Sequence, residues 1–237
     1  MEIKKHIPNS ITCMNLFSGC VSIVLAFHGF FLWALLFILL AGVFDFCDGM
    51  AARLLHTSSV IGKELDSLAD VVSFGLAPSM IIFKHIDNIS DSEWVMFLAF
   101  FIAVFSALRL AKFNVDTRQT SSFIGLPTPP NAIFFASLLS ITDPMMPVPS
   151  YLGREMFMPI LNNLWVILFL VAIFSYLLVA EIPMFSLKFK NLSWSDNKVR
   201  FIFLILSALL LIVFQLAAFP FIILLYLVMS VVTAYKA

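Results

Sequence analysis

Long apolar stretches alternate with short polar connections along almost the whole chain. Eight apolar windows lie between charged residues, glycine or proline. Each is close to the length of about 20 residues that a membrane-spanning helix needs. The windows cover residues 11–28, 30–55, 65–86, 93–113, 127–143, 161–182, 200–216 and 218–235. They lack the alternation of a barrel strand, and unpaired backbone amides are costly in hydrocarbon, so each window is predicted to be a helix.

Composition narrows the class of protein further. Of the 237 residues, 62% are hydrophobic and 12% are charged, whereas ordinary soluble domains have about 45–50% and about 25%. The sequence therefore predicts an all-α, polytopic helical membrane protein with about eight transmembrane helices in the lipid bilayer. Lys and Arg number 14 and Asp and Glu also number 14, so there is no basic excess and nucleic acid is not an expected partner.

The basic residues are spread unevenly over the connections between the windows. Lys and Arg concentrate on the cytoplasmic side of membrane proteins. With the N-terminus inside, only Lys84 and Arg154 fall outside, and the other twelve bases fall inside: Lys4, Lys5, Arg53, Lys63, Arg109, Lys112, Arg118, Lys188, Lys190, Lys198, Arg200 and Lys236. The asymmetry predicts that the N- and C-termini are both cytoplasmic.

Five acidic residues fall in the 26 residues from Asp45 to Asp70. A carboxylate at the centre of a membrane helix costs about 2.5–3.5 kcal/mol, so it is expected to face a partner, a cavity or a metal. Asp45 and Asp48 are three residues apart, and Asp66 and Asp70 are four apart, so each pair lies on one helix face. A polar break at residues 56–62 lets the second helix fold back, and the two pairs can converge.

Converging carboxylates need a compensating charge. Hard oxygen ligands suit Mg²⁺ or Mn²⁺, and four carboxylates can hold one ion or a bridged pair. Such sites are typical of phosphoryl transfer. Gly49 leaves backbone room for a substrate, and the Arg53 guanidinium can bind a phosphate through two hydrogen bonds. The simpler alternative, ion pairing of the acids with Arg53 and Lys63, leaves most of the five acids unbalanced.

This acidic stretch resembles the signature of the CDP-alcohol phosphatidyltransferases, D-x2-D-G-x2-A-R-x8-G-x3-D-x3-D. Every fixed position is matched, by Asp45, Asp48, Gly49, Ala52, Arg53, Gly62, Asp66 and Asp70. Upstream, PNSIT is similar to an N-x-x-T element of the family through Asn9 and Thr12. Within the family the chain most resembles the bacterial and archaeal phosphatidylserine synthases, through the stretches VVSFGLAPS, RLAKFNV and FIGLPTPPNA.

The resemblance implies a metal-dependent transferase of phospholipid synthesis. Its substrates would be CDP-diacylglycerol and L-serine, and its products phosphatidylserine and CMP. The family fold implies a single integral membrane domain over residues 1–237, with an interfacial segment (1–10), a catalytic six-helix core (11–182) and two additional transmembrane helices (200–235). The active site is expected at the cytoplasmic face of the cell (inner) membrane, and a homodimer is expected from the family.

The resemblance also implies a role for each matching residue. Two divalent ions, Mg or Mn, would be ligated by Asp45, Asp48, Asp66 and Asp70, and Asp70 would also accept the proton of the attacking alcohol. CDP-diacylglycerol would contact Asn9, Thr12, Asp48, Gly49, Ala52, Arg53, Ser59 and Gly62. Thr57 or Ser58 could take the place of Ser59, which could instead cap the next helix.

Recognition of serine requires a cation for its carboxylate and hydrogen-bond acceptors for its ammonium group. The end of the fourth predicted span and the start of the fifth supply six candidates: Arg109, Lys112, Asn114, Arg118, Thr128 and Asn131. Arg109 is the first choice because it lies within the helical pattern. Alternatively, Arg109 is a topology determinant, Lys112 and Arg118 face lipid headgroups, and Thr128 caps a helix.

Two other functions fit parts of the pattern. The first is the same transfer to another alcohol, such as glycerol 3-phosphate or an inositol phosphate, because the basic cluster could bind a phosphate. The second is a cation transporter that uses the carboxylates as an ion path. The positions of the acids disfavour a transporter, since they lie at helix ends and the later spans carry no ionisable residue near their centres.

Overall fold

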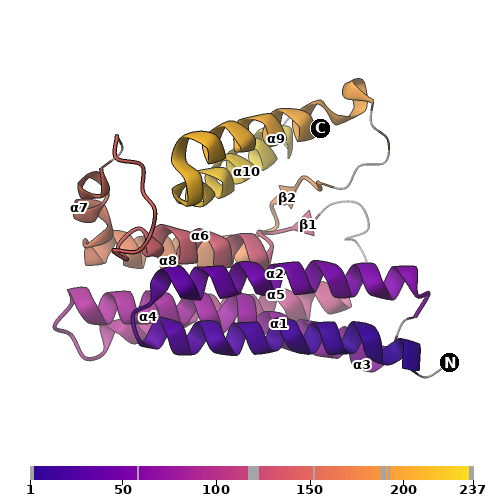
Figure 1. Ribbon diagram of the computed structural model, residues 1–237. Coiled ribbons are helices and arrows are strands. Elements are labelled where there is room, and N and C mark those ends of the chain that lie inside the picture. The colour runs from indigo at the N-terminus through magenta and orange to yellow at the C-terminus, as the bar shows by residue number, and fades with distance from the viewer. Residues whose placement is uncertain are drawn as a thin grey trace.

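The structure is a computed structural model that describes residues 3–57, 59–116, 123–151, 153–187, 191 and 193–234. It opens with an antiparallel pair of long helices, α1 (Ile3–Phe27) and α2 (Phe31–Leu54), which lie side by side along the bundle (Figure 1). Gly29 turns the chain between them with a φ of 81°, a left-handed conformation that glycine adopts without a Cβ clash. The polar connection after α2 reverses the chain again, so α3 (Val60–Asp70) runs back beside α1.

The Ser59 hydroxyl begins α3 by accepting the Gly62 N–H at 2.9 Å. The helix then continues without a break through the π-helical turn η1 (Val71–Leu76) into α4 (Ala77–Ile89). A π-helical turn places one more residue per turn than an α-helix, and such turns are frequent at functional sites. Here the π-helical turn directly follows Asp70, so it sets how the end of α3 faces α1.

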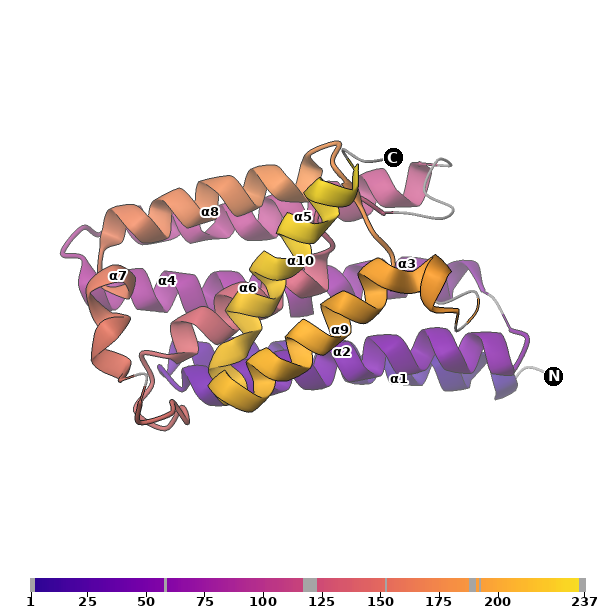
Figure 2. The ribbon, with the colours of Figure 1, turned by 90° about the horizontal axis from the view of Figure 1, so that it is seen from above.

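The rest of the described chain is also mostly helical. In chain order it contains η2 (Val95–Phe100), α5 (Phe101–Val115), α6 (Thr128–Ser140), η3 (Arg154–Met156), α7 (Met158–Leu161), α8 (Leu164–Val179), α9 (Trp194–Phe214), η4 (Gln215–Ala218) and α10 (Phe219–Ala234). Two short strands, β1 (Phe123–Ile124) and β2 (Pro183–Met184), pair antiparallel. Seen from above, α9 and α10 cross the bundle obliquely, and α10 packs on α6 (Figure 2).

The predicted helical membrane protein is confirmed, but the predicted count of eight spans is not. Among the described residues, five helical stretches are long and apolar enough to cross a membrane, or six if the bent pair Arg154–Leu161 and Leu164–Val179 is one span. The shortfall from eight to six has two reasons: the predicted windows 200–216 and 218–235 fall in one helical stretch, Trp194–Ala234, and the window 127–143 holds a helix too short to span a bilayer. Helix α6 has 13 residues, or about 20 Å at 1.5 Å per residue, whereas the hydrocarbon core is about 30 Å thick.

One close helix contact fixes α1 against the π-helical turn. A Cβ on Gly19 would lie 2.4 Å from Ser73 Oγ and 2.8 Å from Ser73 Cα, so only glycine fits there. The Ser73 hydroxyl donates a hydrogen bond to the Asn15 carbonyl at 3.0 Å. This contact sets the distance between α1 and the end of α3, where two of the four predicted metal-ligand aspartates lie.

Replacing Gly19 by alanine is expected to destabilise the protein. The added methyl meets the Ser73 backbone as well as its hydroxyl, and overpacking of this kind costs about 1–3 kcal/mol. We expect a lower unfolding temperature in detergent solution. Gly42→Ala is the matched control, because its Cβ would meet only the Phe74 ring at 3.9 Å. Equal unfolding temperatures for the two variants would contradict the close contact.

Candidate active site

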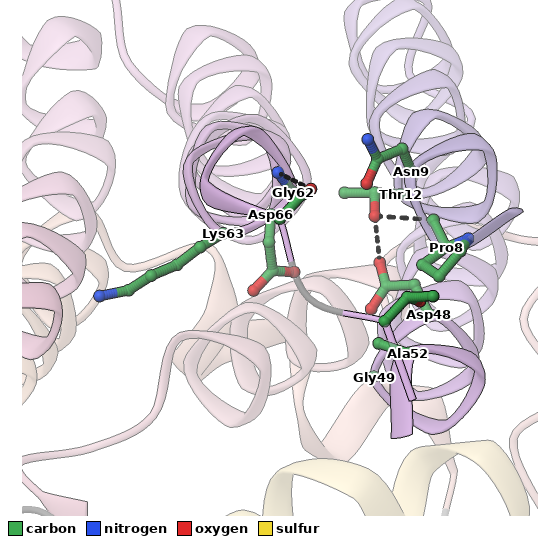
Figure 3. A pocket seen from close by; sticks show the side chains of 11 residues that line it. Pro8, Asn9, Thr12, Asp48, Gly49, Ala52, Gly62, Lys63 and Asp66 are labelled. Carbon is green, nitrogen blue, oxygen red and sulfur yellow. Dashed lines mark hydrogen bonds between the residues drawn. The ribbon is translucent and has the colours of Figure 1, made fainter. Parts of the chain in front are cut away.

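Three of the four predicted aspartates converge between α2 and α3. Asp45 and Asp48 project from α2 and Asp66 from α3, and each offers a carboxylate oxygen within 4.8 Å of the other two. Figure 3 shows Asp48 and Asp66 directed into the space between the two helices. The chain reversal after α2 thus brings the Asp45–Asp48 pair against Asp66, the first member of the other predicted pair.

Helix α1 positions Asp48 from the other side. The Thr12 hydroxyl, 3% exposed, lies 2.7 Å from Asp48 Oδ2 as a hydrogen-bond donor. The predicted nucleotide-binding residue Thr12 therefore contacts an acidic residue directly, a link between α1 and α2 that the spacing within either helix does not reveal.

Asp70 lies one turn beyond Asp66 on α3 and outside the group of three. Asn15 of α1 donates a hydrogen bond to Asp70 Oδ1 at 3.3 Å, and Arg109 of α5 lies within electrostatic range of the carboxylate. Asn15 was not among the predicted site residues. Its signal in the sequence is a polar side chain in an apolar window, three residues after Thr12 and so on the same helix face.

A cavity of about 280 Å³ opens beside the acidic cluster. It is lined by most of the residues predicted to contact CDP-diacylglycerol: Asn9, Thr12, Asp48, Gly49, Ala52, Ser59 and Gly62. Four further residues also line it: Pro8, Thr57, Lys63 and Asp66. Residues from α1, α2 and α3 thus form one pocket, although the chain separates Asn9 from Gly62 by more than fifty residues.

Two glycines of the signature shape this cavity in different ways. A Cβ on Gly62 would lie 2.8 Å from Ser59 Oγ and 2.9 Å from Asn9 Oδ1, so glycine permits the approach of α1. A Cβ on Gly49 would meet nothing within 4 Å. The backbone at Gly49 therefore adjoins open cavity, as predicted for a position that a substrate approaches.

The two cations nearest in sequence turn away from the carboxylates. Arg53, predicted to bind phosphate, does not line the cavity, and its Nε donates to the Gly49 carbonyl on its own helix at 2.9 Å. Lys63 lines the cavity with its stem, but Figure 3 shows its ammonium group pointing away, and Nζ donates to the Asn114 carbonyl at 3.2 Å. Neither cation forms an ion pair with the acidic cluster among the described residues.

The chemistry of the cluster fits a divalent cation. Asp66 Oδ1 is buried and has no hydrogen-bond partner among the described residues. Three carboxylates form an all-oxygen donor set, which suits a hard cation. Buried charges without a partner are costly, and a metal ion in this cluster would satisfy them.

The candidate acceptor residues on α5 differ in their surroundings. Arg109 is 8% exposed, lies 5.6 Å from the Phe113 ring centre, and its Nε has no hydrogen-bond partner in the described part of the chain. Lys112 is exposed and lines a small cavity of about 30 Å³ with Arg109.

The Asn114 side chain donates to Ser67 Oγ at 2.8 Å and so connects α5 to α3. Arg118 and Ser58 lie outside the described residues.

The candidate acceptor residues on α6 are fully buried. Thr128 is the first residue of α6 and makes no capping hydrogen bond there. The Thr128 hydroxyl and both polar atoms of the Asn131 side chain have no partner among the described residues. Buried polar groups are usually hydrogen-bonded, so unpartnered ones call for a ligand or water.

Comparison with known proteins finds relatives that match about half of the chain. A relative from Helicobacter pylori strain J99 is 39% identical over 128 residues, covering 53% of this chain and 54% of its own. One from Bacillus subtilis is 40% identical over 126 residues, covering 52% and 70%. Both are named CDP-diacylglycerol–serine O-phosphatidyltransferase. An archaetidylserine synthase from Methanothermobacter thermautotrophicus is 36% identical over 134 residues, covering 55% and 56%.

The chain thus spans about half the length of several relatives that it matches. The match to a family as a whole is more extensive. The family described as CDP-alcohol phosphatidyltransferase matches residues 5–235, from the first turns of α1 to the end of α10. The chain belongs to the CDP-alcohol phosphatidyltransferase family.

Proposed function

We propose that this protein is a CDP-diacylglycerol–serine O-phosphatidyltransferase, which transfers the phosphatidyl group of CDP-diacylglycerol to the hydroxyl of L-serine. The observation that carries the proposal is the convergence of Asp45, Asp48 and Asp66 beside a cavity lined by the family's signature residues. The names of the relatives support serine as the acceptor.

Asp45, Asp48, Asp66 and Asp70 would hold two divalent ions, Mg²⁺ or Mn²⁺, which when bound would neutralise the diphosphate and the departing CMP. Thr12 fixes the orientation of Asp48 through its hydrogen bond. Asn9, Ala52, Ser59 and the open backbone at Gly49 would surround the cytidine and diphosphate. The exposed Arg53 side chain would exchange its contact with the Gly49 carbonyl for a phosphate oxygen.

Asp70 is proposed as the proton acceptor. The Asn15 amide donates to Oδ1 and so holds the carboxylate with Oδ2 left to receive the proton of the serine hydroxyl. The hydroxyl oxygen attacks the lipid-side phosphorus, the bond from that phosphorus to the CMP oxygen breaks, and CMP leaves. A carboxylate is a weak base toward an alcohol, so the proton would move to Asp70 as attack proceeds rather than before it.

The serine carboxylate would bind Arg109. Among the described residues, Arg109 is the only buried Lys or Arg side chain, and a single buried cation suits one carboxylate. Thr128 and Asn131 have unpartnered polar atoms that could bind the ammonium group. A phosphorylated acceptor such as glycerol 3-phosphate would need more than one cation, which Lys112 and Arg118 would have to supply.

The membrane setting is proposed from the placement of charge. The last turns of α2 and α5 and the start of α3 lie at one end of the bundle, and the last turn of α4 lies at the opposite end near α7 (Figure 1). The acidic cluster belongs to α2 and α3 at the first of these ends, whereas Lys84 belongs to α4 and Arg154 to η3, next to α7. Because bases favour the cytoplasmic side, the acidic end and both termini would face the cytoplasm of the cell (inner) membrane. Exposed apolar side chains on α9 and α10 would face lipid or a second subunit of a homodimer.

An acceptor panel tests the proposed function directly. Membranes containing the protein would be incubated with CDP-diacylglycerol, Mg²⁺ or Mn²⁺, and serine, glycerol 3-phosphate or an inositol phosphate in turn. Of the acceptors tested, we expect only serine to support CMP release. Turnover with glycerol 3-phosphate but not with serine would contradict the assignment of the acceptor.

Asp70→Asn is expected to abolish most of the activity. The amide keeps the size of the side chain and the contact with Asn15 but cannot accept the proton, and loss of a general base costs about 10²–10⁴ in rate. CMP release measures the effect, and metal binding should survive in part. Asp87→Asn is the control, because Asp87 pairs with Lys84 on α4 away from the cluster. Normal CMP production by Asp70→Asn would refute the role of Asp70.

Thr12→Val is expected to raise the metal concentration that gives half-maximal activity. The variant removes the hydroxyl that orients Asp48, and the loss of such a partner of a ligand costs about 10–100-fold in metal affinity or activity. Metal titration of CMP release measures the shift. Thr12→Ser keeps a hydroxyl and should behave like the wild-type protein. An unchanged titration for Thr12→Val would show that the hydrogen bond does not matter.

A further inference from the structure

A tyrosine on the last helix lies beside the proposed acceptor end of the site. Tyr226 of α10 is 7% exposed, and its hydroxyl donates to the Phe185 carbonyl at 3.1 Å. Its ring lies 4.9 Å from the Phe185 ring and 6.0 Å from the Phe203 ring, measured between centroids. The side chain is therefore held by Phe185 and Phe203, and the hydrogen bond sets the direction of the hydroxyl.

The carbonyl that Tyr226 binds belongs to the segment that follows β2. Strand β2 pairs with β1, with Ile124 opposite Pro183. The chain then passes from β1 into α6 through Gly125, whose N–H donates to the Ile182 carbonyl at 2.9 Å. Tyr226 thus anchors the segment after β2, one strand of a small two-stranded ladder. The other strand, β1, leads into the start of α6.

The turn into α6 has little freedom of its own. Gly125 has a φ of 75°, and a Cβ there would lie 2.7 Å from the Leu178 carbonyl. The next residue, Leu126, donates its N–H to the Leu177 carbonyl at 2.9 Å. A shift of the ladder would therefore also move the start of α6, which begins two residues after Leu126.

The start of α6 carries Thr128 and Asn131, the buried side chains whose polar atoms are unpartnered. Arg109 lies within electrostatic range of both Tyr226 and Asp70. A phenol has one proton to donate, and here the Phe185 carbonyl receives it. Tyr226 therefore has no proton left to donate to an acceptor carboxylate.

We propose that Tyr226 is a positioning residue for the acceptor pocket, which acts through the β1–β2 ladder and Arg109 rather than by touching the acceptor. The proposal rests on the proposed function, because it treats Arg109 and the start of α6 as the acceptor end. It gives the C-terminal hairpin of α9 and α10 a part in acceptor binding in addition to its contact with the membrane.

The test compares Tyr226→Phe with the wild-type protein, as full-length chains in phospholipid. The variant keeps the ring packing and removes only the hydroxyl, so the partly buried Phe185 carbonyl loses this donor. We expect the KM for serine to rise about tenfold, equivalent to about 1.4 kcal/mol, with the KM for CDP-diacylglycerol unchanged. A purely structural defect would lower the amount of active protein and so kcat, without changing one KM selectively.

Tyr151→Phe is the matched control. The Tyr151 hydroxyl also donates to a carbonyl of the hairpin, that of Val213 at the end of α9, but away from the ladder. Its KM for serine should equal that of the wild-type protein. An unchanged KM in Tyr226→Phe, or the same rise in Tyr151→Phe, would overturn the proposal.

The acceptor panel separates this proposal from the proposed function. If the wild-type protein uses another alcohol, the KM for that alcohol replaces the KM for serine, and the same expectation holds. If no alcohol yields CMP, the proposed function fails. Amide hydrogen exchange at Gly125 and Leu126 then tests the positioning role of Tyr226 without any activity. Faster exchange in Tyr226→Phe but not in Tyr151→Phe supports this role, and unchanged exchange in Tyr226→Phe refutes it.

Discussion

The cost of placing carboxylates at the end of an apolar bundle governs this structure. Charged groups removed from water must be paired, hydrogen-bonded or bound to metal. Here each of Asp45, Asp48 and Asp66 offers a carboxylate oxygen within 4.8 Å of the other two. Repulsion between the carboxylates therefore adds to the cost of removing each one from water. Such an arrangement calls for a compensating charge, which a divalent cation between the oxygens would supply. The surrounding helices hold the acidic cluster in place.

Helix α1 carries much of that arrangement. Thr12 and Asn15 lie on one face and donate to Asp48 and Asp70, on two different helices. The close contact of Gly19 with Ser73 keeps α1 near enough for both hydrogen bonds. One helix face thus orients a proposed metal ligand and the proposed proton acceptor, and the same helix lines the cavity with Asn9.

The second half of the chain completes the site from the opposite side. Arg109, within electrostatic range of Asp70, connects the end of α3 to α5. The short helix α6 brings the unpartnered side chains of Thr128 and Asn131 into the interior. Helix α6 is too short to span a bilayer, which is consistent with a role in building the interior. Its start is held by the β1–β2 ladder, and the ladder in turn by Tyr226 on α10.

The sequence by itself determined the membrane class, the approximate positions of the longer helices and the four candidate aspartates, because hydrophobicity and i, i+3 or i, i+4 spacing are local properties. Only the tertiary structure decided which side chains meet. The contacts of Asn15 with Asp70, of Asn114 with Ser67 and of Tyr226 with Phe185 all depend on distances between separate elements. The number of spans also needed the structure, because an apolar window predicts a helix but does not fix where it ends.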